Sequence, residues 1–368
     1  MDHRELIEQT EQYKDEMSPD ERSRMYKSGQ PVDRIPVSIS IRETMAPFYG
    51  FTIGEYRRDF EKRAMVYEQA CRDFACFGIS LGPNLRGIGE ALGACAVYPE
   101  NSTDYIISYP IKDITSVRSL EPPDPYHNTV LRSMMDEMGR YGKRFGKACP
   151  ISTEIAGPLT TAASILPIES LLAESIEHPD KVHDLLELSL ASVLFWVEAV
   201  YAEYGIETVN VADPVASCGV IGTHLFRELA KPFLLRLRRE VERITGKAPA
   251  LHICGKTSPI WPDLAELGYA SFRVDNCENI AELKRAIGDK MAISGNVPPV
   301  DVMLHGTIDQ VLEVSLECIR LGADSPCGFT LAAGCQLPPG VPKDNLLAML
   351  LAARKYGRNA KMGRNLNI

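Results

Sequence analysis

The sequence has no excess of positive charge and no long apolar run. Lys and Arg number 40 against 49 Asp and Glu, which gives a formal net charge of -9 at pH 7. A nucleic-acid-binding surface would need a basic face. The most apolar run, residues 346–353, is far shorter than the roughly 18 residues of a membrane span. We therefore expect neither a nucleic-acid nor a membrane partner.

The N-terminal segment also lacks targeting features. Residues 1–24 are dense in charge, with neither the apolar centre of a signal peptide nor the acid-poor pattern of a transit peptide. We expect a cytoplasmic protein. Because that compartment keeps thiols reduced, the 10 cysteines are expected to be packing residues or metal ligands rather than disulfides.

Hydrophobic residues make up 45% of the chain and charged residues 24%, ordinary values for a globular protein. From residue 149 onward, short β-rich runs alternate with amphipathic helical stretches. This pattern predicts a parallel sheet and, with so many units, a closed (β/α)8 TIM barrel in preference to an open doubly wound sheet. The expected strands are 34–40, 150–155, 208–212, 248–253, 271–274, 291–294 and 329–332.

Two helices, 4–16 and 18–29, are expected before the first strand. Ser18, Pro19 and Glu21 give the second one a capped start. We therefore predict an N-terminal helical extension over 1–30 and one α/β barrel domain over 31–368. The glycine-rich passage 78–93 misses the dinucleotide-binding fingerprint by one residue and is expected to be a loop or a tight turn.

Polar residues follow most of the expected strands, and in a barrel such residues converge at one mouth. Each of them alone could equally be a helix cap or a turn residue. The set consists of Glu154, Asp213, His252, Cys254, Asp275, Asn276, Asn296 and Cys335.

His252 and Cys254 stand two residues apart at a strand end, so a regular strand would direct both side chains to the same face. Cys335, also at a strand end, qualifies as a third ligand, whereas Cys327 precedes its strand. One imidazole and two thiolates suit Zn²⁺ and leave a fourth position open for substrate. The alternative is that the His-x-Cys spacing is accidental and both cysteines are core residues. The remaining cysteines are expected to be packing residues: Cys71, Cys76, Cys95, Cys149, Cys218, Cys277 and Cys318.

Four passages together resemble the uroporphyrinogen decarboxylase superfamily: MSPDERSRMYKSGQPVDRIPV, LHICG, ISGNVPP and LAAGCQLPPGVPKDN. The His-x-Cys and distant Cys set is similar to its zinc-dependent branch, the methylcobamide:coenzyme M methyltransferases and related corrinoid methyltransferases. The resemblance implies a single-domain barrel with His252, Cys254 and Cys335 as zinc ligands.

The resemblance also implies the reaction, a methyl transfer between a corrinoid and a small-molecule sulfur or oxygen, with either a thiol acceptor or a methyl ether donor. The chain has no Asp-x-His-x-x-Gly cobalamin signature, which is consistent with a corrinoid carried by a partner protein. Asp213 and Glu154 are the expected catalytic residues. Asp275, Asn276 and Asn296 are expected to bind substrate.

Two other functions remain open. The first is a metal-free decarboxylase-like lyase on the same fold. The decarboxylase carries an Arg-rich stretch after its first strand, however, and this chain has only Arg42 in SISIRETMAP. The second is a non-catalytic barrel that binds a corrinoid protein.

Overall fold

A computed structural model describes residues 1–75, 78–146, 149–366 and 368. The chain divides into two compact units. Unit 1 comprises Met1–Phe77, Glu100–Ser102 and Ser271–Ile368, and unit 2 comprises Gly78–Pro99 and Thr103–Ala270.

Unit 1 is built from the two ends of the chain. Its elements are α1 (His3–Gln12), α2 (Pro19–Lys27), β1 (Val32–Arg34), β2 (Val37–Ser38), the 3₁₀ helix η1 (Glu43–Tyr49), α3 (Ile53–Arg58), α4 (Phe60–Phe74), β9 (Ser271–Arg273), α13 (Ile280–Ile287), β10 (Ala292–Val297), α14 (Ile308–Gly322), β11 (Phe329–Ala333), α15 (Lys343–Tyr356) and β12 (Arg358–Ala360).

Four parallel strands of unit 1 lie in the order β2-β11-β10-β9. β1 and β12 form a separate antiparallel pair, in which Val32 faces Ala360. The helix α15, which is almost entirely buried, packs against α14. α2 begins as expected, with the Ser18 hydroxyl accepting from the Glu21 N–H and Pro19 at the first helical position.

Unit 2 is the central part of the chain. Its elements are β3 (Ile79–Asn84), α5 (Gly87–Ala91), β4 (Cys95–Val97), β5 (Tyr105–Ser108), the 3₁₀ helix η2 (Ile114–Ser119), α6 (Thr129–Phe145), β6 (Ile151–Ala156), α7 (Pro158–Ile165), α8 (Ile168–Glu177), α9 (Pro179–Tyr204), β7 (Val209–Ala212), the 3₁₀ helix η4 (Pro214–Ala216), α10 (Cys218–Leu225), the π-helix η5 (Phe226–Ala230), α11 (Lys231–Thr245), β8 (Ala250–His252), the 3₁₀ helix η6 (Ser258–Ile260) and α12 (Trp261–Leu267).

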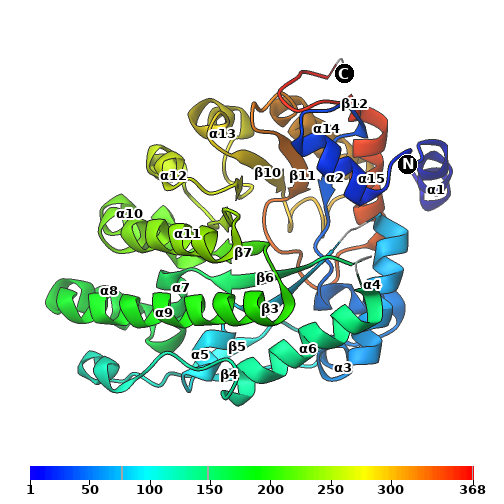
Figure 1. The fold of residues 1–368 in the computed structure, drawn as a ribbon. Coiled ribbons are helices and arrows are strands. Elements are labelled where there is room, and N and C mark those ends of the chain that lie inside the picture. The colour runs from blue at the N-terminus through cyan, green and yellow to red at the C-terminus, as the bar shows by residue number, and fades with distance from the viewer. Residues whose placement is uncertain (76–77, 147–148, 367) are drawn as a thin grey trace. The chain divides into compact units, whose positions relative to one another are not determined.

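The four parallel strands of unit 2 lie in the order β8-β7-β6-β3, and β4 and β5 pair as an antiparallel hairpin. α9 packs against α7 and α11 (Figure 1). The Trp196 indole N–H of α9 donates to Thr153 Oγ1 of β6 at 2.8 Å. Thr153 therefore faces the helices, and its neighbours Ser152 and Glu154 face the opposite, inner side of the sheet.

Every expected strand overlaps an observed one, and the two units together supply eight parallel strands. One expectation was wrong: the glycine-rich passage after Gly78 contains β3 and α5 rather than only a loop or a turn. Gly82 lies there at φ +134°, where a Cβ would come within 2.6 Å of Thr153 Oγ1. Glycine thus allows β3 to approach β6 closely. Glycine and proline are uncommon inside strands, however, so Gly82 and Pro83 made a strand hard to predict from the sequence.

One helix in the described part of the chain is long and apolar enough to cross a membrane, namely α9. The apolar residues of α9 are interrupted by charged and polar side chains, so the helix contains no continuous apolar run of this length. α7 and α8 would make a second candidate only if they were taken as one span despite a bend of 106°. In α9, 61% of the apolar window is buried, as in the core helix of a folded domain.

Candidate metal centre

His252 and Cys254 lie at the end of β8 with their side chains together. The His252 Nε2 atom is 2.9 Å from Cys254 Sγ, and both residues are half-buried. Cys254 comes two positions after His252, the last residue of β8, so an extended backbone directs both side chains to the same face. The sequence-based pairing of these two side chains therefore agrees with the structure of unit 2.

Backbone contacts hold the chain on both sides of this pair. The Asp213 N–H donates to the His252 carbonyl at 2.9 Å, which extends the β7–β8 pairing. Beyond Cys254 the Lys256 carbonyl accepts from the Cys218 N–H at 2.9 Å, and the buried Thr257 hydroxyl accepts from the Trp261 indole. The two side chains are thus presented by an ordered turn.

Cys335 belongs to unit 1 and comes two residues after β11. Its backbone is held by Arg273 of β9, whose Nε and Nη2 atoms donate to the Ala333 carbonyl at 3.1 and 2.9 Å. Arg273 Nη2 also donates to the Cys335 carbonyl at 3.3 Å. Sequence reasoning missed Arg273. The available signal was a charged residue inside a short strand, two positions before Asp275.

His252 and Cys254 of unit 2 and Cys335 of unit 1 are all half-buried, and each offers one atom that can ligate a metal ion. Imidazole nitrogen and thiolate sulfur are the ligands that Zn²⁺ prefers, whereas Mg²⁺ and Ca²⁺ prefer oxygen. The donor set therefore fits zinc.

The turn after β9 holds the expected substrate-binding residues. Asp275 is half-buried, and its Oδ1 accepts from the Cys277 N–H at 3.0 Å, while Asn276 is exposed. The buried Asn296 side chain donates to the Asp275 and Glu278 carbonyls at 3.0 and 2.7 Å. Asn296 thus fixes the turn that presents Asp275.

Glu154 is half-buried on the inner face of β6, in register with Asn210 of β7. Asn210 Nδ2 donates to the Ser152 hydroxyl at 3.3 Å on the same face. This inner face is polar, whereas barrel interiors are usually filled by branched apolar side chains. Glu154 therefore lies among polar side chains on this face.

Asp213 is fully buried. Its Oδ1 atom accepts from the N–H and hydroxyl of Thr160 at 2.8 and 2.6 Å, in the first turn of α7. Burial raises the pKa of the Asp213 carboxyl to about 6, although hydrogen bonds from Thr160 and the Leu159 N–H act in the opposite direction. Oδ2 has no hydrogen-bond partner among the described residues.

Two of the cysteines expected to be packing residues are exposed, Cys95 of the β4–β5 hairpin and Cys277 of the turn after β9. Cys149 and Cys318 are buried, as expected. Cys76 lies outside the described residues.

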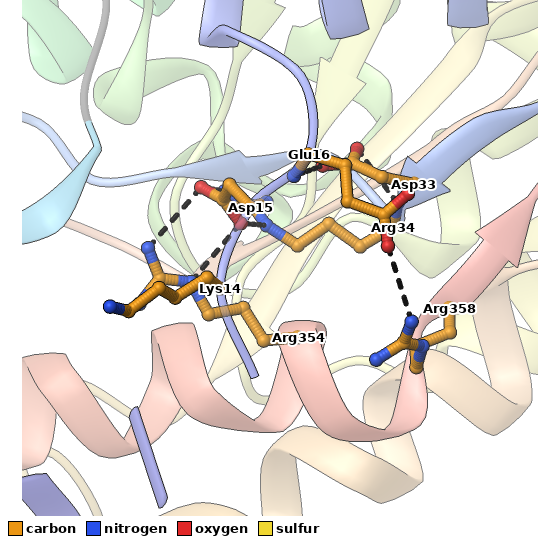
Figure 2. Close-up of a pocket in the computed structure, with 7 residues that line it drawn as sticks. All are labelled: Lys14, Asp15, Glu16, Asp33, Arg34, Arg354 and Arg358. Carbon is orange, nitrogen blue, oxygen red and sulfur yellow. Dashed lines mark hydrogen bonds and ion pairs between the residues drawn. The ribbon is translucent and has the colours of Figure 1, made fainter. Parts of the chain in front are cut away.

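Figure 2 shows a small pocket elsewhere in unit 1, and its lining is almost entirely charged. Asp15 accepts a two-pronged ion pair from Arg34 at 2.6 and 2.9 Å and a second one from Arg354 at 3.1 and 3.3 Å. Arg34 precedes β2, at the amino end of this first barrel strand. Because active sites of α/β barrels lie at the carboxyl ends of strands, this pocket is a structural ion-pair cluster. Its lining residues are Lys14, Asp15, Glu16, Asp33, Arg34, Arg354 and Arg358.

Comparison with solved structures supports the fold. A methyltransferase from Methanosarcina mazei superposes with a TM-score of 0.79 at 23% identity, covering 92% of this chain and 98% of that one. Together with the eight parallel strands, this likeness confirms the α/β barrel class.

Comparison with characterised proteins gives relatives of two activities. The chain is 24% identical over 334 residues to a methylcobamide:CoM methyltransferase of Methanosarcina barkeri, covering 89% of this chain and 95% of the relative. It is 25% identical to a methylated-thiol–coenzyme M methyltransferase of Methanosarcina mazei, covering 92% and 90%. It is also 26% identical to a uroporphyrinogen decarboxylase of Xylella fastidiosa, covering 89% and 96%.

The names of these relatives describe different chemistries, so membership in the family is separate from the choice of reaction. The model of the family described as "Uroporphyrinogen decarboxylase (URO-D)" matches residues 18–356, which include the whole of the parallel sheet and all three potential metal ligands. This chain belongs to the uroporphyrinogen decarboxylase (URO-D) family.

Proposed function

We propose that this chain is a zinc-dependent methyltransferase that moves a methyl group between a corrinoid and a small-molecule sulfur or oxygen. The observation that carries the proposal is the His252–Cys254 pair at the end of β8, with its 2.9 Å separation between Nε2 and Sγ. Cys335, which comes two residues after the end of the parallel strand β11, is the proposed third ligand. Carboxyl ends of barrel strands are where such enzymes assemble their sites.

The charge of the proposed centre suits thiol chemistry. Zn²⁺ with two thiolates and one neutral imidazole has no net charge, so an added substrate thiolate would keep much of its nucleophilicity. Zinc bound by these three residues would supply a Lewis acid with one open position, which lowers the pKa of a substrate thiol or polarises an ether oxygen.

The transfer is a displacement at the methyl carbon. In one direction a substrate sulfur forms a bond to the methyl carbon while the cobalt–carbon bond breaks and its electron pair stays on cobalt. In the other direction Co(I) takes the methyl group of an ether, and the departing oxygen needs a proton. Glu154, half-buried on the polar inner face, is the proposed proton donor or acceptor.

The other expected residues take supporting roles in this proposal. Asp275 and Asn276 would contact the polar part of the substrate, and Asn296 would hold their turn through its two backbone hydrogen bonds. Asp213, which is fully buried, would act by fixing the start of α7 rather than by touching substrate.

The proposed partner is a separate corrinoid-binding protein. The names of two relatives, a methylcobamide:CoM and a methylated-thiol–coenzyme M methyltransferase, support a methylated corrinoid or a thiol as reactants.

The first test is zinc content, measured by elemental analysis after purification under reducing conditions. We expect about one zinc per wild-type chain and its loss in Cys335→Ala. Cys327→Ala is the matched control, because Cys327 is a half-buried thiol of the same unit that precedes β11, and it should retain zinc. Zinc absent from the wild type, or retained in Cys335→Ala, would contradict the proposed centre.

The second test is methyl transfer from free methylcobalamin to a panel of thiols, together with demethylation of methoxylated compounds in the presence of Co(I) cobalamin. We expect transfer by the wild type and the Cys327→Ala control, and none by Cys335→Ala. A metal-independent decarboxylation that survives Cys335→Ala would instead favour the lyase, the activity of the Xylella fastidiosa relative.

A further inference from the structure

The loop that carries Cys335 is held from three directions within unit 1. The Gly334 N–H donates to the Val297 carbonyl at 2.9 Å and so continues the pairing of β11 with β10. Gly334 itself lies against the backbone of the next turn, where an added Cβ would come within 2.6 Å of the Asn276 nitrogen. Arg273 supplies the third constraint through the Ala333 and Cys335 carbonyls.

The Arg273 side chain makes directional hydrogen bonds to main-chain carbonyls, and these bonds fix the position of the backbone. Two donors of one planar guanidinium converge on the Ala333 carbonyl, and the same Nη2 reaches the Cys335 carbonyl two residues later. Ala333 is the last residue of β11 and Cys335 lies two residues beyond it, so the guanidinium binds the backbone at and just after the end of the strand. The rigid fork of arginine can bind two carbonyls at once, which a single flexible ammonium does less well.

We propose that Arg273 is a positioning residue that holds the Cys335 backbone in the geometry needed for metal binding. The inference rests on the proposed function, since it assigns Cys335 the role of a zinc ligand. Residues that orient the ligands of a metal commonly change its affinity by 10- to 100-fold when they are replaced. Arg273 does this through main-chain carbonyls, so its effect should reach the metal without any contact between guanidinium and ion.

The test compares Arg273→Met, which keeps an unbranched apolar stem but removes every donor, with the wild type. Zinc affinity is measured by competition with a chromophoric chelator, and the site is loaded with Co²⁺ to record its ligand-field and thiolate-to-metal absorption. We expect Arg273→Met to bind zinc at least about 10-fold more weakly and to show an altered cobalt spectrum. Arg273→Lys should lose less, because it keeps one cationic donor.

Arg238→Met is the matched control. Arg238 also donates from its Nε to a backbone carbonyl, that of Gly268, at 2.9 Å, but it lies in α11, away from the proposed ligands. It should leave the zinc affinity and the cobalt spectrum unchanged. Thermal unfolding of each variant separates loss of folding from loss of positioning. If Arg273→Met does not fold, Arg273→Lys decides the question, since wild-type affinity and spectrum in that variant would overturn the inference.

The outcomes distinguish this inference from the function on which it rests. A wild type that binds zinc, together with a folded Arg273→Met of equal affinity and identical cobalt spectrum, would overturn the role of Arg273 and leave the proposed metal centre standing. A wild type without zinc would overturn the proposed function itself and, with it, this inference.

Discussion

The Asp213 carboxyl is buried, and hydrogen bonds to one of its two oxygens only partly stabilise its ionised form. One oxygen accepts two hydrogen bonds from Thr160, and the other has no partner among the described residues. Burial raises the pKa to about 6. The proton is therefore held more tightly in the folded state than in the unfolded chain, where an Asp carboxyl has a pKa near 4.

This shift predicts a specific pH dependence. Because the folded pKa is raised, the stabilising contribution is fully present below about pH 4 and is lost as the pH rises through about 6. Asp213→Asn removes the titration and keeps an acceptor for Thr160. Between pH 5 and pH 8 the free energy of unfolding of the wild type should fall by about 1 kcal/mol relative to Asp213→Asn, as measured by urea denaturation. A constant difference across this range would contradict the prediction.

For single residues, the sequence predicts which neighbouring side chains share a face better than it predicts their burial or their distant partners. His252 and Cys254 could be paired in advance because strand alternation alone places both on one face. The burial of Asp213 could not be predicted, because its partner Thr160 lies 53 positions away in the chain. Arg273 was missed for the same reason, since the carbonyls that it holds are 60 and 62 positions away.

Among the elements, the segment between α1 and α2 is tied to the C-terminal helix α15 by charge. Asp15 accepts from Arg34 and Arg354 together (Figure 2). Burial alone would raise the pKa of Asp15, but the hydrogen bonds and charges of these two arginines outweigh it and hold the pKa well below its usual value. Arg34 is almost fully buried, so the Asp15 carboxylate is needed to compensate the positive charge of its guanidinium.

Removing the Asp15 charge should therefore cost far more than removing an exposed partner. Asp15→Asn leaves the buried Arg34 guanidinium uncompensated, and we expect a loss of about 3 kcal/mol in the free energy of unfolding. Glu8→Gln is the control, since its ion pair with Arg4 is exposed and should be worth less than about 0.5 kcal/mol. Denaturant unfolding at pH 7 measures both. Equal effects in the two variants would show that the cluster does not stabilise unit 1.

The depressed pKa of Asp15 also predicts how the free energy of unfolding of the wild type changes at acid pH. Since the folded pKa of Asp15 is depressed, its contribution is present above pH 4 and is lost as the pH falls toward the folded value. The advantage of the wild type over Asp15→Asn should accordingly shrink below about pH 4.

Elements with a clear hydrophobic period were predicted well, and those built on special backbone conformations were not. The strands expected at 208–212 and 329–332 are β7 and β11. β3 was missed because Gly82 and Pro83 interrupt its pattern, although its close contact with β6 requires that glycine.

For the whole molecule, the proposed zinc ion should behave as a ligand of the folded state. A ligand present at about 100 times its dissociation constant stabilises by about 2.7 kcal/mol if it does not bind the unfolded chain. Stripping the metal with a chelator should lower the melting temperature, and added Zn²⁺ should restore it. Cys335→Ala should melt at the same temperature with and without zinc. A wild-type melting temperature that is indifferent to chelation would contradict this prediction.

The barrel class was predictable at this scale because the alternation of strands and helices leaves few other folds open. The division of the chain into two compact units was not, because it depends on which distant segments pack together. No local pattern near Phe77 or Ser271 marks where one unit gives way to the other.

That division has a consequence for how the protein is made. Residues 78–270 contain the whole of unit 2, interrupted only by residues 100–102 of unit 1. All segments of unit 2 are therefore available to pack together as soon as this stretch has left the ribosome. In unit 1, β2 pairs with β11 and β1 pairs with β12. The first strands of the chain therefore cannot form these pairs until the last strands have been translated. During that interval the nascent N-terminal segment exposes strand edges and apolar side chains, and this is the stage of biosynthesis at which a chaperone would be needed most.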